Sequence, residues 1–469
     1  MENRDESEEK FRDRLYTIDE QGKRIWVFAK KPSGQLTTTR NIMGIILMIF
    51  LFAAPFIKVN GQQLLLFDFY HRIFVIFGMQ FWPQDFQLFF LGMISLMVFI
   101  ILFTATYGRL WCGWACPQTI FTEVIFRRIE YWIEGDHNAQ RELDQSPWNG
   151  NKIFRKGIKH LVFYMISFAI GNTFLMYLIG SDQWIKLVTE PPADHILGLT
   201  GMIVFSFIFY FIFSWFREQV CTIVCPYGRL QGVLLDRNSI VISYDYKRGE
   251  GRGAIRKNEI RSEVMKGDCI DCKQCVLVCP TGIDIRNGTQ LECINCACCI
   301  DACDEVMKRV GFKPGLIRYA SEKMIFDRQP WHFTLRSGIY TTLLTILLTT
   351  FFYFLLTKHP VEATVMRSPG MLFQDQGDGK ISNLYDIKVV NKTSNDLPLE
   401  IRLISPQGSI QMIGNNKIVK KQTLGEMTFF VILDQKILNG EKTKLEIGVF
   451  EGDKKLDQTS ATFLGPKKQ

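Results

Sequence analysis

Two runs of four cysteines in the middle of the chain constrain its fold more than any other feature. The first has the spacing Cys-x2-Cys-x2-Cys-x3-Cys-Pro, and the second repeats this rhythm but has Asp304 in place of the proline. The doubled spacing is typical of segments that hold two [4Fe-4S] clusters, in which the fourth cysteine of each run ligates the other cluster. We expect one cluster at Cys269, Cys272, Cys275 and Cys303, and another at Cys293, Cys296, Cys299 and Cys279.

Zinc ribbons are the alternative, since zinc sites also use Cys-x2-Cys pairs. A zinc ribbon needs two such pairs, however, whereas this chain has two runs of four cysteines. The pattern therefore favours iron–sulfur clusters, which transfer single electrons. Cys298 falls outside the rhythm and is interpreted as a thiol that is not a ligand.

Five nearly uncharged stretches approach the length of about 20 residues that crosses a bilayer. A sixth, residues 64–82, is interrupted by Asp68, His71 and Arg72, and we interpret it as an interfacial or re-entrant segment, with a spanning helix as the alternative. The sequence thus predicts a multi-pass membrane protein. The five predicted spans cover residues 42–57, 86–106, 161–180, 195–216 and 339–357.

The distribution of Lys and Arg orients these spans. Both residues are frequent in the N-terminal segment and in the connection 109–160, and they are rare in the connections after the first and third spans. The positive-inside rule therefore places the N-terminus and the cysteine runs in the cytoplasm, and the C-terminal domain in the periplasm. The net charge of +8 lies mostly in membrane-facing loops, so membrane lipid is an expected partner and nucleic acid is not.

A second motif, Cys-x3-Cys-Pro, occurs at residues 112–117 and 221–226, each time just after a span that ends in the cytoplasm. Residues i and i+4 share one face of a helix, and proline tends to end the helix before it. Each motif is therefore expected to present two thiols together at a helix end. If the two hairpins pack as a pseudo-symmetric repeat, the sulfurs of Cys112, Cys116, Cys221 and Cys225 converge on one site.

These four cysteines are predicted to be catalytic and metal-binding. Buried cysteines are often only small apolar side chains, but packing does not require a whole motif to recur at equivalent points. Thiolates suit soft ions, so copper is the expected ion, while a further iron–sulfur centre or disulfides are left open.

The C-terminal part has a different pattern, in which short alternating runs are separated by Asn, Gly, Pro and Lys turns. This pattern predicts an immunoglobulin-like β-sandwich. The fold class is therefore a multidomain membrane protein with a five-helix transmembrane bundle, a cytoplasmic two-[4Fe-4S] ferredoxin domain and a C-terminal sandwich. The predicted domains are a cytoplasmic tail 1–40, a four-span region 41–217, a cytoplasmic segment 218–338 with the ferredoxin domain at about 260–312, a fifth span 339–357 and a periplasmic domain 365–469.

The cysteine runs, with Pro280-Thr281-Gly282-Ile283-Asp284 between them, and the string Trp111-Cys112-Gly113-Trp114-Ala115-Cys116-Pro117 together resemble the FixG/CcoG/RdxA family. These are accessory proteins of the bacterial inner membrane for the assembly of cbb(3)-type cytochrome oxidases. The resemblance covers nearly the whole chain. It implies a Cu(II) reductase that supplies Cu(I) to the oxidase, with electrons passing through the clusters and copper handled by the Cys-x3-Cys-Pro cysteines.

The partners that this resemblance implies are copper ions, oxidase assembly factors or a copper chaperone, and an unidentified electron donor; homodimerisation is left open. Two functions of other classes are kept. A quinol dehydrogenase or electron conduit, like the membrane ferredoxins of denitrification, would use the same motifs to reduce another protein. A non-enzymatic scaffold would hold copper or oxidase subunits, although the doubled cluster motif speaks against it.

Overall fold

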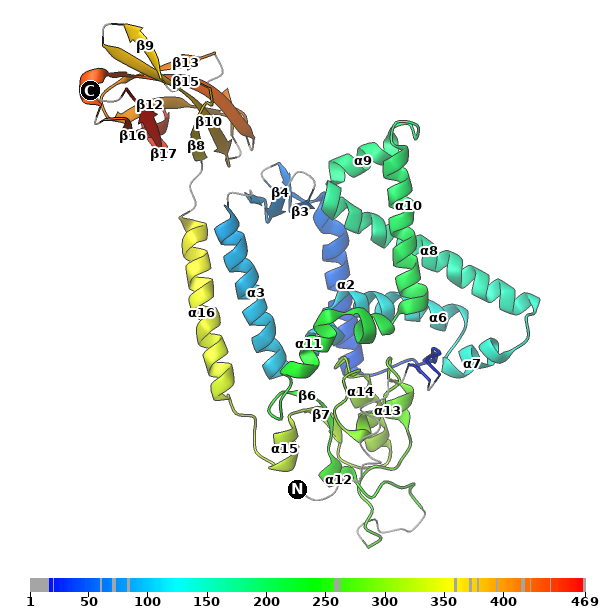
Figure 1. Cartoon of the computed structure of the whole chain (residues 1–469). Coiled ribbons are helices and arrows are strands. Elements are labelled where there is room, and N and C mark those ends of the chain that lie inside the picture. Colours follow the sequence, from blue (N-terminus) through cyan, green and yellow to red (C-terminus); the bar gives the residue numbers. More distant parts are fainter. Residues whose placement is uncertain are drawn as a thin grey trace. The chain divides into compact units, whose positions relative to one another are not determined.

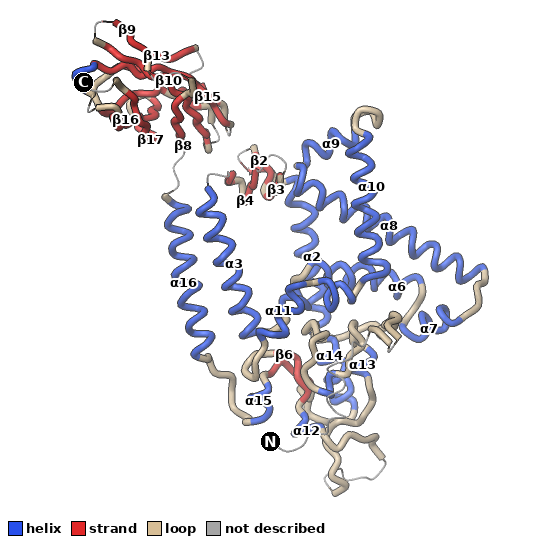
Figure 2. Tube along the Cα trace, in the orientation of Figure 1, coloured by secondary structure: helices blue, strands red, loops and turns tan. Residues whose placement is uncertain are grey.

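A computed structural model describes residues 17–466, apart from 20, 60, 70–72, 82–84, 257–260, 262, 358–360, 371–372, 378, 394, 415–417, 422 and 439. The chain divides into two compact units. Figures 1 and 2 show its helices and strands. The first comprises Met1–Ile57, Gln63–Arg72 and Phe89–Thr349, and the second Lys58–Gln62, Ile73–Leu88 and Thr350–Gln469.

Among the described residues, five helices are long and apolar enough to cross a membrane, as predicted (Figure 1). They are α2 (Gln35–Ala53) continued by η1 (Ala54–Phe56), α3 (Phe86–Tyr107), α8 (Gly150–Ile179), α10 (Ile196–Phe211) continued by the π-helix η4 (Ile212–Phe216), and α16 (Leu335–Leu356). Within the first unit, α8 packs along α10.

The helix α8 begins well before the predicted residue 161. Its first turns contain Lys156 and Lys159, whose charges excluded them from an apolar window. Lys159 lies 2.9 Å from Glu134, and Lys156 lies 3.4 Å from the same carboxylate. Because these ammonium groups are paired, the helix can continue through them without leaving a buried charge uncompensated.

Residues 64–82 form short strands, in agreement with the interpretation that this stretch is not a spanning helix. Asp68 is buried at the end of a strand. His71, Arg72 and Trp82 lie outside the described residues. The strands are β3 (Leu65–Asp68), β4 (Ile73–Ile76) and β5 (Met79–Phe81), preceded by β1 (Lys58–Val59) and β2 (Gln62–Gln63).

Short helices connect the spans and carry the Cys-x3-Cys-Pro motifs. Between α3 and α8 lie α4 (Leu110–Trp114), α5 (Pro117–Ile120), the π-helix η3 (Phe121–Phe126), α6 (Arg127–Ile133) and α7 (His137–Gln145). The helix α9 (Ser181–Thr189) follows α8, and the π-helix η5 (Val220–Val224) and α11 (Pro226–Leu234) follow η4.

The cysteine runs fold as a repeat of one loop conformation. Asp271 and Lys273 in the first loop have φ of 53° and 55°, and Asn295 and Ala297 in the second have 54° and 64°. The repeated spacing therefore gives a repeated backbone. Around the loops lie β6 (Val241–Tyr244) paired antiparallel with β7 (Ile317–Ala320), α12 (Tyr246–Gly249), α13 (Gln274–Leu277), η6 (Ile285–Asn287), α14 (Cys298–Arg309) and α15 (Glu322–Phe326).

The second unit contains the predicted immunoglobulin-like sandwich. Its core is built by alternating side chains of the facing strands, among them Tyr385, Phe429, Ile447 and Phe463. One sheet has the order β13 (Ser409–Ile413), β15 (Leu424–Asp434), β10 (Lys380–Asn391), β8 (Val361–Arg367), with β9 (Gln374–Gly377) also on β10. The other has β12 (Glu400–Ser405), β16 (Lys442–Glu451), β17 (Lys454–Leu464); β11 (Leu397–Pro398) pairs β14 (Ile418–Val419), and η7 spans Gln435–Ile437. The first strand begins at Val361, before the predicted residue 365.

Within the second unit, the buried Lys392 of the sandwich forms an ion pair with Asp85, the residue before α3. The Nζ atom of Lys392 lies 2.6 Å from Asp85 and 2.7 Å from Glu362. The side chains of Lys392 and Asp85 are each only 7% exposed. Burial alone would lower the pKa of Lys392, but hydrogen bonds to the two carboxylates outweigh burial and raise it.

Replacing Lys392 by Met should destabilise the second unit by about 3 kcal/mol, because it removes the cation that two buried or half-buried carboxylates face. The matched control is Lys388→Met, since Lys388 forms an exposed pair with Glu426 and its loss should cost less than about 1 kcal/mol. Calorimetry of the full chain measures both. Equal shifts of the sandwich transition in the two variants would contradict the prediction.

Candidate electron-transfer and thiol site

The two Cys-x3-Cys-Pro motifs share one backbone conformation at their second cysteine and the proline. In each, the proline opens a new helix, α5 or α11, and the preceding cysteine is extended. The amide of Cys116 donates to the carbonyl of Trp111 at 3.0 Å, and the amide of Cys225 donates to that of Val220 at 2.8 Å, both five residues back. The expectation that each pair lies on one helix is wrong. Proline disfavours the helical conformation of the residue before it, so the second cysteine stands outside the helix that carries the first.

The structure brings the four thiols of these motifs together. Burial, followed by the nearby thiols of Cys116, Cys112 and Cys225, raises the pKa of Cys221 to about 12. Burial is also the largest cause that raises the pKa of Cys112 to about 11, with Cys116 and Cys225 contributing. Among the described residues, no three His, Cys, Asp or Glu side chains are grouped closely enough to hold a metal ion. The four thiols are therefore neighbours, but neither they nor the two cysteine sets of the runs are as close together as the ligands of one bound ion.

Two polar residues that sequence reasoning did not assign to the site join its parts. The Sγ of Cys112 donates to Oε1 of the buried Gln231 on α11 at 3.2 Å. The guanidinium of Arg109, also buried, donates to the carbonyls of Leu291 and Gly228. In the sequence Arg109 counted only as a loop charge. Its place between both motifs and the ferredoxin segment depends on contacts distant in sequence.

The first motif touches the second cysteine loop directly. A Cβ on Gly113 would clash with the carbonyl oxygen of Ile294 and come within 2.8 Å of the Asn295 backbone. Beside this contact, Nε1 of Trp114 donates to the hydroxyl of Tyr319 at 3.0 Å, and that hydroxyl donates to the Asn295 carbonyl at 2.8 Å. Only glycine permits this approach of α4 to the loop.

The surroundings of the cysteine runs fit the two [4Fe-4S] clusters that their spacing predicts. A small cavity is lined by the four cysteines of the second predicted set and otherwise mostly by apolar side chains such as Ile242 and Ile283. In the first set, burial raises the pKa of Cys303 to about 12, with contributions from Cys272 and Cys269 among the causes. Each set thus shares a neighbourhood that four thiolates of a [4Fe-4S] cluster require. The assignment of individual ligands stays a prediction. The cavity cysteines are Cys279, Cys293, Cys296 and Cys299.

Cys298, which the sequence leaves outside both sets, contacts a predicted ligand. It is buried at the start of α14. A side-chain hydrogen bond with Cys298 is the largest cause that lowers the pKa of Cys296. The thiol of Cys298 therefore lies beside a predicted ligand of the second cluster.

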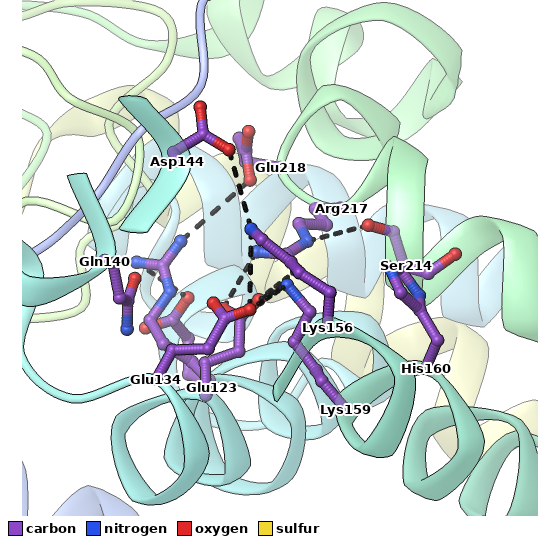
Figure 3. A network of polar contacts seen from close by, with 12 residues as sticks. Glu123, Glu134, Gln140, Asp144, Lys156, Lys159, His160, Ser214, Arg217 and Glu218 are labelled. Atoms are coloured by element: carbon purple, nitrogen blue, oxygen red, sulfur yellow. Dashed lines mark hydrogen bonds and ion pairs between the residues drawn. The ribbon is translucent and has the colours of Figure 1, made fainter. Parts of the chain in front are cut away.

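A buried network of ion pairs supports the segment that leads into the second motif (Figure 3). Nη1 of Arg217 donates to Glu130 at 2.9 Å, and Lys159 lies 3.5 Å from the same carboxylate. Although burial raises the pKa of Glu130, Arg217 and Lys159 hold it down at about 2. Arg217 has φ of 46°, unusual for a residue with a side chain, and it stands shortly before Cys221. The network thus fixes a strained turn that positions the second motif.

Comparison with known proteins agrees with this architecture. Protein RdxA of Cereibacter sphaeroides is 35% identical over 79% of this chain and 80% of its own length. Protein RdxB of the same organism is 35% identical over 82% of this chain and 83% of its own, and the nitrogen fixation protein FixG of Rhizobium meliloti is 37% identical over 64% and 58%. The chain belongs to the FixG/RdxA family.

Three domain models match this FixG/RdxA family member. A 4Fe-4S dicluster domain matches residues 216–322, a 4Fe-4S binding domain matches 89–135, and the IG-like fold at the C-terminus of FixG matches 351–466. The prediction of a membrane iron–sulfur protein with a C-terminal immunoglobulin-like domain is confirmed, as are two iron–sulfur clusters and an oxidoreductase function in general. The model at 89–135 includes Cys112 and Cys116.

Replacing Gly113 by Ala should destabilise the chain by about 1–3 kcal/mol, because the new methyl group overpacks the contact with Ile294. Iron content should persist because no predicted ligand changes, while the electron paramagnetic resonance (EPR) spectrum of the reduced protein should shift. The control is Gly157→Ala on α8, where the added Cβ meets open space and should be neutral or slightly stabilising. A wild-type spectrum and stability in Gly113→Ala would contradict the role of this contact.

Proposed function

We propose that this protein reduces Cu(II) to Cu(I) at the Cys-x3-Cys-Pro thiols for assembly of the copper centre of a cbb(3)-type cytochrome oxidase. The observation that supports this most directly is the placement of the four thiols beside the ferredoxin segment. The first motif is in backbone contact with the loop of the second cysteine run, through Gly113 and Ile294. Electrons and copper are thereby brought to neighbouring sites of one chain.

The chemistry of the thiols favours the reduced ion. Cu(II) prefers nitrogen and oxygen ligands, whereas Cu(I) prefers sulfur, so neighbouring thiols that bind the ion would stabilise the product of the reduction. Ferredoxin-type clusters, when bound, supply single electrons at potentials that lie on the order of −400 mV, which matches the one electron that each Cu(II) takes up. Because Cys112 and Cys221 are protonated at neutral pH, they lose protons when they bind the ion.

The two cysteine sets differ in their access to partners. Cys272 is the exposed member of the first set, whose other cysteines are buried, whereas the second set has buried and partly buried cysteines and no exposed one. We infer that an electron donor approaches the exposed loop and that electrons leave through the buried set toward Cys112. In this proposal the N-terminus, both loops and the motifs face the cytoplasm, and the sandwich faces the periplasm, where an assembly factor or copper chaperone would meet it.

An electron conduit is the second candidate. The ferredoxin-type protein NapH of Escherichia coli is 21% identical over 45% of this chain. The 4Fe-4S binding domain that matches residues 89–135 leaves room for a further cluster at the Cys-x3-Cys-Pro cysteines. In that case the protein would pass electrons to another protein and leave Cu(II) unreduced.

The variants Cys112→Ala and Cys225→Ala test the proposed copper site. Protein reduced anaerobically and mixed with Cu(II) should yield Cu(I), detected with a Cu(I)-specific chelator, as the EPR signal of the reduced clusters disappears. Each variant should keep its clusters but slow this reaction about tenfold or more, because a thiolate for the product is lost. Thr222→Ala, inside the second motif, is the matched control and should behave as wild type. Full reduction by both cysteine variants would refute the placement.

The variant Cys275→Ser separates an oxidoreductase from a scaffold. Cys275 is a buried predicted ligand of the first set, so its replacement should lower the iron content and abolish Cu(II) reduction. Cells that carry this variant should fail to assemble active oxidase although the protein is present in the membrane. Normal oxidase assembly without the first cluster would support the scaffold instead.

A further inference from the structure

A cavity of about 500 Å³ lies beside the first turns of α2 and along α6, within the first unit. Two carboxylates line it, against a larger number of cations, so its charge is positive. An anion is the ligand that this lining favours. Four cationic and two aromatic side chains contribute: Lys31, Arg40, Arg127, Arg128, Tyr131 and Trp132.

Two of the cations are buried and incompletely hydrogen-bonded. Arg40 is only 3% exposed and donates from Nη1 to the carbonyl of Cys296 at 3.2 Å, but its Nε has no hydrogen-bond partner among the described residues. Arg127 is 4% exposed and donates from Nη2 to the Pro280 carbonyl at 3.4 Å, while its Nη1 makes no hydrogen bond within the described part of the chain but lies 3.4 Å from Oε1 of Glu123. Leaving a buried donor unsatisfied is costly, so Nε of Arg40 in particular favours an acceptor in the cavity.

The carboxylates of the lining have other contacts. Glu123 lies 3.4 Å from Arg127. Asp136 accepts the backbone N–H of Lys31 at 2.9 Å and lies 3.3 Å from His137. Neither carboxylate therefore supplies the acceptor that Nε of Arg40 lacks.

We propose that this cavity binds a phosphate group, with Arg40 at its base and the exposed Arg128 at its mouth. The planar guanidinium groups suit phosphate oxygens, to which arginine donates in pairs. Arg40 lies in the second turn of a membrane-spanning helix, and Tyr131 and Trp132 are residue types enriched at the membrane interface. The phosphate therefore belongs either to an anionic phospholipid headgroup or to a soluble phosphate ester.

The bound phosphate is coupled to the second cysteine set. Arg40 contacts the backbone of Cys296, and Arg127 contacts that of Pro280, the residue after Cys279. A negative charge on these guanidinium groups weakens their electrostatic support for an added electron, so binding lowers the reduction potential of that cluster. This coupling does not require copper reduction.

The test uses the full-length protein with its clusters in nanodiscs. One arm adds inorganic phosphate to discs of phosphatidylcholine and measures binding by calorimetry and the cluster potentials by EPR titration. The other compares discs of phosphatidylcholine with discs containing phosphatidylglycerol, and measures by native mass spectrometry whether the anionic lipid is retained. The variants are Arg40→Gln and Arg128→Gln, and Arg141→Gln on α7, an exposed residue outside the cavity lining, is the control.

Wild type should bind one of the two probes and show a lower potential for one cluster. Arg128→Gln, on the surface and safe for folding, should weaken binding about tenfold, as expected for loss of one charged hydrogen bond, while Arg141→Gln should not. Binding of free phosphate identifies a soluble ester, and retention of phosphatidylglycerol alone identifies a lipid. The proposal is overturned if neither probe binds, or if Arg128→Gln binds as well as wild type. In that case the negative charge that balances Arg40 is that of the cluster.

Discussion

The close approach of α4 to the second cysteine loop is the contact on which the rest of the site depends. Gly113 lets two backbones meet where any side chain would separate them. Trp114 donates a hydrogen bond to Tyr319, which donates one to the Asn295 carbonyl of the loop. Because backbone atoms rather than long side chains set this distance, it varies little with side-chain motion. A short and fixed separation is what transfer of single electrons between two sites requires.

Buried ion pairs hold the second Cys-x3-Cys-Pro motif in place. Charges removed from water are stable only when they are paired, and breaking one such pair costs far more than breaking a surface pair. Here Arg217, held by Glu130, keeps a positive φ just before the second motif. Arg24 and Glu218, 2.8 Å apart, join the N-terminal segment to the same turn. The second motif is thereby held by charges, whereas the first is held by close packing.

The features that could be predicted from the sequence are those that depend on the spacing of residues close together in the chain. The two cysteine runs have the same spacing, and their loops have positive φ at equivalent positions. The spans follow from uninterrupted stretches of apolar residues. The convergence of the two motifs was predicted from their repetition. The extended conformation of Cys116 is local, because Pro117 disfavours a helical conformation of the residue before it. Two features were beyond local spacing: the π-helix η5 around Cys221 and the partners of Arg109. The carbonyls of Leu291 and Gly228, which Arg109 contacts, lie far from it in the chain, and no periodicity connects them.

The two cysteine loops have equivalent backbone conformations in different surroundings. Asp271 and Lys273 in the first loop are exposed, whereas Asn295 and Ala297 at the equivalent positions are buried. Burial disfavours the negative charge that an added electron brings, and hydrogen bonds or cations near the sulfurs favour it. The second loop has both, since Cys298 hydrogen-bonds to Cys296 and the guanidinium of Arg40 reaches the Cys296 carbonyl. Because the two loops have the same cysteine spacing and the same positive-φ positions, these neighbours are what make the surroundings of the two predicted clusters electrostatically different.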